Sequence, residues 1–312
     1  MARDAQGARA RSRGALLAVT LGVALAGCGD PTTPPQETVK SAAPPSSAPP
    51  IQISPQLAPG STNDPNPLEL PPRSLELAVG SRVFAPTATT LRGAKLGSTL
   101  ALRATTIQGR SGDALILDGR DGPPYEVHAA YVIPITGAPR PRLQAPVIAE
   151  WAGALRHGVV RRYVKDRIAV RFTDTVDRGE RLVAPAQLVL QTDGFRPGNY
   201  AIARGSEEWE HVLLISPLEE EPRRWLCTGY GGAARLVPEA ELRAVPVVYS
   251  PKVGALVWVE HLGRMRPGVV KEVDPPGWAT VRFERVGRPV QVGWGSIMAP
   301  LADAPPPPRP TR

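Results

Sequence analysis

Few residues of the chain have the type and spacing that catalysis or metal binding requires. The histidines are scattered and follow no ligand spacing such as His-x-x-x-His; they are His128, His157, His211 and His261. A zinc site needs three or four converging nitrogen, sulfur or oxygen donors. No serine lies in a nucleophile elbow, and no glycine-rich phosphate loop follows a strand. We therefore predict no catalytic residue, no metal site and no cofactor.

Two smaller features are also interpreted without a catalytic role. The segment "LEEEP", residues 218–222, places three carboxylates in a hairpin loop. Calcium normally takes six to eight oxygen ligands, so a solvated loop is the favoured interpretation. Cys227 lies in an apolar strand with no histidine partner identifiable by sequence. An enzyme, for example an envelope hydrolase, would need a constellation of groups that the sequence does not reveal.

The N-terminal segment has the organisation of an export signal. Four arginines precede an apolar run over residues 15–26, which ends in "LAGC". The run is shorter than the roughly 20 apolar residues that a membrane-spanning helix needs. A basic start, a short apolar middle and small residues after it are typical of a secretory signal peptide. We assign residues 1–27 to this signal.

The end of that signal, Leu25 to Cys28, resembles the lipobox of bacterial lipoproteins. The resemblance implies cleavage before Cys28 and lipidation of that residue, which would anchor the chain to the membrane of the cell envelope. Gly29 follows the cysteine, where an aspartate favours inner-membrane retention. The outer membrane, facing the periplasm or the cell surface, is therefore the expected location.

Two segments have a composition that cannot form a packed core. Residues 28–75, the lipidated cysteine and a linker, and residues 302–312 are rich in proline with few aromatic residues. Such segments bury too little apolar surface to offset the entropy of ordering. We predict a disordered tether and a disordered C-terminal tail.

Between these segments the sequence predicts an all-β fold with internal repeats. Short valine, leucine and isoleucine runs alternate with glycine and proline turns, and no helical stripe persists for three turns. "VIAEWAGALRHGVVR", residues 147–161, is repeated as "VWVEHLGRMRPGVVK", residues 257–271. A partial third copy includes "NYAIAR", and a first copy has longer loops. The predicted units are 76–137, 143–192, 196–248 and 252–301.

A unit that runs from "VGALVWVEHLGRMRPGVVKEV" through "ATVRFE" to "SIMAP" resembles the Tudor domains, within the wider class of SH3-like small β-barrels. The resemblance covers the second and fourth units, part of the third and little of the first. It implies a tandem array of about four such barrels. Because SH3-like barrels serve unrelated binding tasks, it supports the fold better than the function.

Tudor domains that read methylated side chains use an aromatic cage, since ring faces attract ammonium groups. The third unit keeps Trp209 and Tyr230 at cage positions but has Ala203 and Cys227 where rings are expected. The alternatives are a binding platform and packing between units. In the second and fourth units, a glutamate and an arginine replace cage aromatics; these pairs are Glu150 with Arg156 and Glu260 with Arg266. We expect each pair to form a salt bridge rather than a cage.

Trp258 is a third candidate binding residue, because strand alternation places it opposite to Val257 and Val259, away from the core. It could contact a sugar or a protein, or seal the joint between barrels. Removal of the signal leaves 33 basic and 28 acidic residues, a formal net charge of about +5. This modest charge does not indicate nucleic acid binding. The sequence thus predicts a membrane-anchored, non-enzymatic binding or scaffold protein with a protein or peptide partner. The alternative partner is an anionic cell-wall or surface polysaccharide.

Overall fold

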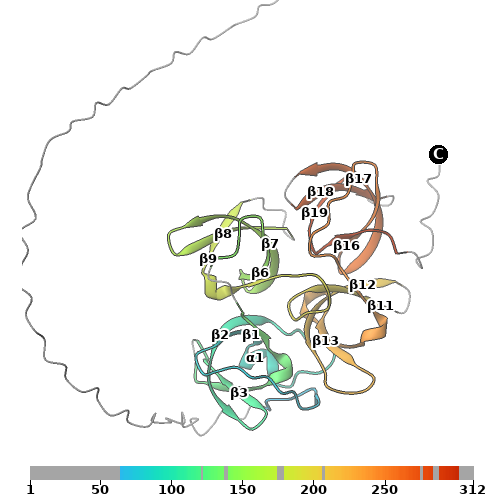
Figure 1. Ribbon diagram of the computed structural model, residues 1–312. Helices are drawn as coiled ribbons and strands as arrows, with labels where there is room; N and C mark the ends of the chain where they lie inside the picture. The colour runs from blue at the N-terminus through green and yellow to red at the C-terminus, as the bar shows by residue number, and fades with distance from the viewer. Residues whose placement is uncertain are drawn as a thin grey trace, which may run out of the picture. The chain divides into compact units, whose positions relative to one another are not determined.

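The computed structural model describes residues 64–301, except for 121, 137–139, 174–178, 206–207, 275–276 and 284–287. The predicted signal peptide, Cys28, most of the linker and the C-terminal tail lie outside these residues. Antiparallel strands dominate the described part (Figure 1). The prediction of an all-β fold is therefore confirmed.

The strands fall into four sets of five in chain order. Set 1 contains β1 (Arg82–Pro86), β2 (Leu102–Ser111), β3 (Ala114–Leu117), β4 (Tyr125–His128) and β5 (Ile133–Pro134). Set 2 contains β6 (Pro146–Trp151), β7 (Ala154–Val164), β8 (Arg167–Phe172), β9 (Glu180–Val183) and β10 (Leu188–Leu190). Set 3 contains β11 (Tyr200–Arg204), β12 (Trp209–Pro217), β13 (Arg224–Thr228), β14 (Ala234–Pro238) and β15 (Leu242–Ala244). Set 4 contains β16 (Leu256–His261), β17 (Arg264–Asp274), β18 (Trp278–Phe283), β19 (Val290–Gly293) and β20 (Ile297–Met298).

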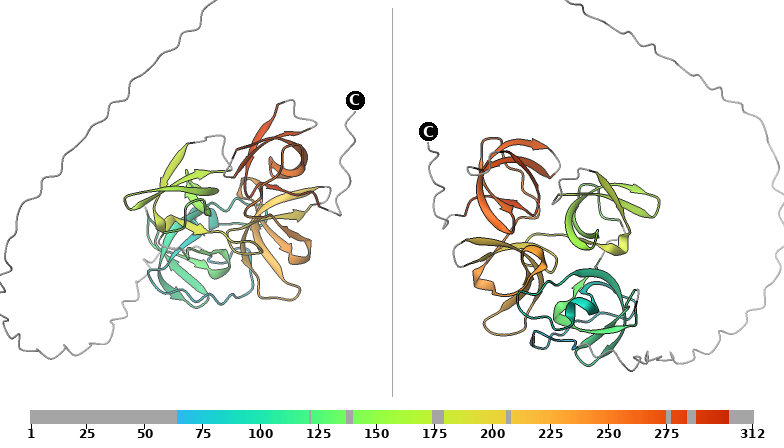
Figure 2. Two further views of the ribbon diagram at one scale, coloured as in Figure 1. Left: turned by 45° about the horizontal axis from the view of Figure 1, so that its top comes forward. Right: turned by 180° about the vertical axis from the view of Figure 1, so that it is seen from behind.

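Each set has the same strand order: the first four strands form a meander, and the fifth pairs with the first. The ribbons of each set curve in all views (Figure 2), although no described sheet closes fully. Sets 1 and 2 are separate five-stranded sheets. Sets 3 and 4 form one ten-stranded sheet because β12 pairs with β17 at Glu210 and Arg264.

A turn before the first strand recurs in every set. Its central residue has a positive φ angle and donates its N–H to a carbonyl of the second strand at 2.8 or 2.9 Å. The donor and acceptor pairs are Gly80 with Ile107, Gln144 with Val160, Gly198 with Leu214, and Gly254 with Val270. Glycine reaches positive φ without steric cost, which explains three of the four positions. Set 2 places Gln144 there, at a φ of 64°.

The second strand of every set carries a register shift immediately after that acceptor. The shifts fall between Ile107 and Gly109, Val160 and Arg162, Leu214 and Ser216, and Val270 and Glu272. A bulge bends a strand and increases its twist. The shared bulge therefore lets the long second strand serve both halves of each curved sheet.

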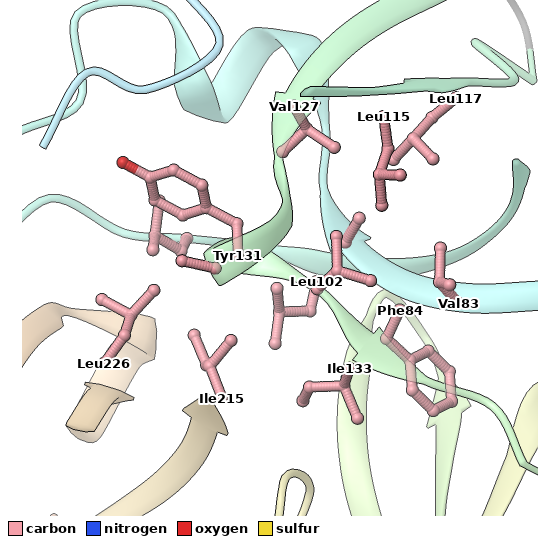
Figure 3. Close-up of a cluster of buried hydrophobic side chains, with 14 of the residues drawn as sticks. Val83, Phe84, Leu102, Leu115, Leu117, Val127, Tyr131, Ile133, Ile215 and Leu226 are labelled. Atoms are coloured by element: carbon pink, nitrogen blue, oxygen red, sulfur yellow. The ribbon is translucent and has the colours of Figure 1, made fainter. Parts of the chain in front are cut away.

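Sets 2, 3 and 4 each have a core of their own, built from alternating inward residues. The core of set 1 is larger and includes side chains from its neighbours. Figure 3 shows Tyr131 close to Leu226 and Ile215 of set 3, with Ile133 and then Phe84 farther along the same cluster. Fully burying one large apolar side chain contributes about 1.5–3 kcal/mol. The joint between sets 1 and 3 is thus stabilised as a continuous core.

Candidate functional site

A cavity of about 660 Å³ with both polar and apolar lining lies in the described part of the chain. This lies within the roughly 300–1,000 Å³ typical of ligand sites. Every strand set, taken with its connecting segments, contributes to the lining. The contributing segments include 99–102 of set 1, 153–156 of set 2, 228–232 of set 3, and Glu260, Gly263 and Ser296 of set 4.

One wall forms where the segment before β2 of set 1 hydrogen-bonds to the segment between β13 and β14 of set 3. Leu100 donates its N–H to the Gly232 carbonyl at 2.9 Å, and the Thr99 hydroxyl donates to the Gly231 carbonyl at 3.1 Å. Gly231 and Gly232 have φ angles of 68° and 80°. These conformations favour glycine, so the "TGYGG" segment is suited to this close backbone approach.

Another part of the lining, in contact with the first wall, comes from the repeated hairpin over residues 257–271. Gly263 has a φ of 80°, and a Cβ atom there would lie 2.3 Å from the Cβ of Tyr230. Only glycine therefore allows Tyr230 to sit against this turn. The Tyr230 side chain remains 65% exposed and lines the cavity.

The polar floor of the cavity is His211. Its Nε2 lies 2.6 Å from the Gly295 carbonyl, and its ring lies on Tyr200 with centroids 4.6 Å apart. Burial lowers the pKa of His211, although the Glu260 carboxylate and the Gly295 contact act in the opposite direction. A carbonyl oxygen only accepts, so Nε2 carries the proton and Nδ1 of the neutral ring is an acceptor.

Behind His211, a second buried histidine fastens set 2 to set 4. His157 Nδ1 lies 2.7 Å from the Thr173 hydroxyl, which lies 3.0 Å from the Trp294 carbonyl. Burial and, to a smaller extent, the neighbouring His211 lower the pKa of His157 to about 3. His157 is therefore neutral near pH 7. Its Nδ1–H donates to the Thr173 hydroxyl, and that hydroxyl donates to the Trp294 carbonyl.

The two glutamates of the repeated hairpin find partners other than the predicted ones. Glu150 accepts the Ala104 N–H at 2.7 Å and pairs with Arg103 at 3.2 Å and Arg120 at 3.5 Å. It therefore joins set 2 to set 1. Glu260 instead accepts the Gly263 N–H of its own hairpin at 2.8 Å.

The arginine of the fourth-unit pair also bonds elsewhere: Arg266 pairs with Glu208 of set 3. The predicted Glu260–Arg266 salt bridge is wrong, because the neighbouring set supplies a better placed carboxylate. In the second unit, Glu150 is used by set 1, so the predicted pair with Arg156 is also replaced. Arg156 lines the cavity.

The three candidate aromatic residues occupy different environments. Trp258 is 8% exposed and packs with Ile202 of set 3 and Met298 of its own set. It points away from the core of its own set, as strand alternation predicts, and seals the joint between sets. Trp209 is half-buried at the same joint, with the Arg243 guanidinium 5.8 Å from its ring centroid. Of the three, Tyr230 lines the cavity.

The other sequence features contribute no reactive group to the cavity. Cys227 is buried, and burial raises the pKa of its thiol; a thiol held protonated is a poor nucleophile. Within the described ranges, no group of three histidine, cysteine or acidic side chains is placed to hold a metal ion. The same residues include no helix long and apolar enough to cross a membrane.

The chain matches no known protein family model. No curated protein matches it either. What the site does must therefore be argued from its own geometry. The cavity offers aromatic and leucine surface, hydroxyl groups, a neutral imidazole acceptor and one carboxylate. This combination is suited to binding.

Proposed function

We propose that the chain is a membrane-anchored, non-enzymatic binding or scaffold protein of the bacterial envelope. A tandem series of four SH3-like barrels would present a shared cavity to a protein or peptide partner. The observation that carries this proposal is that all four strand sets line one cavity, with the exposed Tyr230 at it.

The SH3-like interpretation is supported by strand order. In each set the fifth strand pairs with the first, and the second strand is long and bulged. A single 3₁₀ turn precedes the fifth strand in three sets: η1 (Ala129–Tyr131), η2 (Pro185–Gln187) and η4 (Glu239–Glu241). These features resemble SH3-like small barrels, including the Tudor domains.

The lining favours a peptide partner. Leu100, Leu102, Leu155 and Leu213 provide apolar surface, and Tyr230 provides an exposed aromatic face. Glu260 and Nδ1 of His211 accept hydrogen bonds from backbone or side-chain N–H groups. A peptide presents apolar side chains and N–H donors along one segment, which matches this alternation.

Membrane anchoring rests on the lipobox-like segment and Cys28. A multi-chain lipid anchor gives stable attachment, whereas a single acyl chain is marginal. The proline-rich tether would extend by about 3.1 Å per residue in polyproline geometry. The barrels could then meet a partner well away from the anchoring membrane.

Site-specific photo-crosslinking in intact cells tests the proposal. A photoreactive residue replaces Tyr230 in one strain and Val79, which is 68% exposed and outside the cavity lining, in another. We expect position 230 to yield a discrete crosslinked protein and position 79 to yield none. Equal crosslinking from both positions, or none from position 230, would contradict the cavity as the partner site.

A further inference from the structure

Five cations of set 2 lie in the two segments that meet at Tyr163, away from the cavity. We call this group the basic patch; its residues are Arg140, Arg142, Arg161, Lys165 and Arg167. Three of them belong to the hairpin of β7 and β8, and two belong to the segment that precedes β6. Arg140, Arg142, Lys165 and Arg167 are exposed, and Arg161 is partly exposed.

The two segments are held together by contacts that involve Tyr163 and β7. The Tyr163 hydroxyl donates to the Pro141 carbonyl, and the Arg140 guanidinium lies 5.9 Å from the Tyr163 ring centroid. Gln144 donates its N–H to the Val160 carbonyl at 2.8 Å. The segment is thus fixed along the hairpin, and Arg140 is held beside the Tyr163 ring. Strand pairing sets Arg167 opposite Val164, on the other face from Tyr163.

The charges of the basic patch are not neutralised by the described residues. None of its five cations forms an ion pair within that part of the chain. The adjacent Arg162 differs, because it pairs with Glu180 at 2.8 Å. Asp166 is the acidic residue of the hairpin turn. Clustered like charges repel one another and attract anions.

Apolar surface lies among these charges. The Tyr163 side chain is 38% exposed, and Leu143 is 54% exposed. Sugar rings have C–H faces that pack on such surface, while carboxylate or phosphate substituents pair with arginine in a bidentate way. We propose that the basic patch binds an anionic polysaccharide that carries carboxylate or phosphate groups.

A polymer fits this surface better than an anionic bilayer. Asp166 places a negative charge beside Lys165 at the hairpin turn, which opposes insertion of this turn among anionic headgroups. Interfacial membrane binding relies on apolar residues inserted between headgroups. This binding is separate from the proposed peptide binding because the basic patch lies on a different surface from the cavity. It does not depend on whether the cavity binds a ligand.

Binding of the purified full mature chain to a polyuronate, over a sodium chloride series, tests the proposal. Neutral dextran is the uncharged probe, and vesicles containing anionic phospholipid are the membrane probe. We expect binding to the polyuronate that weakens as salt rises, because association releases counterions. Neutral dextran and the vesicles should bind at least 10-fold more weakly.

A matched pair of triple variants localises the effect. Arg140→Gln, Arg142→Gln and Lys165→Gln together should weaken polyuronate binding about 10-fold or more and reduce the salt slope by about 2. Arg92→Gln, Lys95→Gln and Lys271→Gln remove the same charge at exposed sites elsewhere and should change binding less than 2-fold. Tyr163→Leu should weaken binding without changing the salt slope.

Three outcomes would overturn the proposal. Equal losses in the two triple variants would assign binding to the general charge of the chain. Tighter binding to anionic vesicles than to polyuronate would assign the patch to membrane contact. The third outcome is no binding of polyuronate at low salt, by protein that has the circular dichroism spectrum and melting temperature of the folded chain. This result would exclude anionic polysaccharides as ligands of the basic patch.

Discussion

The carboxylate of Glu150 accepts the backbone N–H of Ala104 at 2.7 Å, whereas Glu260, at the same position of the repeated hairpin, accepts the N–H of Gly263. One copy of this glutamate fastens two strand sets together, and the other closes its own turn. The Glu150 side chain is 6% exposed and also contacts two guanidinium groups. The repeat therefore offers a matched experiment within one chain.

Glu150→Ala should lower the free energy of unfolding by about 2–3 kcal/mol, because it leaves a buried N–H and two arginines without their acceptor. Glu260→Ala should cost about 1 kcal/mol, as expected for one hydrogen bond. Urea unfolding followed by tryptophan fluorescence measures both. Equal costs for the two variants would argue against a special role of Glu150 at the joint.

Stability should fall with acid chiefly through the buried His157, and His128 and His211 should act in the same direction. Their pKa values are lowered in the folded chain, to about 3 for His157, whereas an unfolded histidine titrates near 6.5. The unfolded chain therefore binds more protons below pH 6.5. The stabilisation from the neutral rings is present above that pH and is lost progressively as pH falls toward 3.

The expected slope is about 1.4 kcal/mol per pH unit for His157 in that window. His157→Gln should remove this slope, so that roughly 2.5 kcal/mol of the stability loss between pH 6 and pH 4 disappears, besides lowering stability at pH 7. Urea midpoints measured across pH in both proteins provide the test. An unchanged pH slope in the variant would show that His157 does not contribute to the acid response.

Gly293→Ala should destabilise the joint between sets 2 and 4. An added Cβ would lie 2.2 Å from the Thr173 Cβ and 2.5 Å from its carbonyl oxygen. Overpacking of this kind costs about 1–3 kcal/mol. Gly122→Ala is the control, since no atom lies within 4 Å of its added Cβ, and surface changes stay within about 0.5 kcal/mol. Thermal melts that shift equally in both variants would refute the close approach.

Cys28→Ala should release the protein from the membrane fraction. Without the cysteine no lipid can be attached, and the proline-rich tether has no apolar segment to replace it. Cell fractionation and metabolic labelling with radioactive palmitate measure attachment and lipidation. An inhibitor of lipoprotein signal peptidase should also block processing of the parent chain. Persistent membrane association of the variant together with normal processing under the inhibitor would contradict lipid anchoring.

The strands and hairpins could be predicted because their signals are local. Alternating valines and the glycines of "WAGA" and "HLGR" determine which residues face inward and where the chain turns. Trp258 shows the same rule at work: strand alternation predicted that it points out of its own core. The all-β class follows from many such short patterns.

Contacts between sets could not be predicted in this way. Arg103 and Glu150 are 47 residues apart in the chain, and neither lies in a motif that names the other. Arg156 is only six residues from Glu150, and the sequence pattern therefore favours it as the partner. Tyr200 and Thr99 were missed as cavity residues for the same reason. A signal was available only in "TGYGG", whose adjacent glycines indicate unusual backbone conformations.

The turn at Gly80, Gln144, Gly198 and Gly254 preserves a backbone hydrogen bond while the surrounding side chains diverge. It is therefore a suitable boundary for exchanging one five-stranded set for another. A segment that begins at one of these turns and ends after the next fifth strand carries a whole five-stranded set with its strand pairing intact. Sets 2, 3 and 4 have cores of their own. Exchanging their segments would therefore keep the residues that fold each set and replace those that contact neighbouring sets.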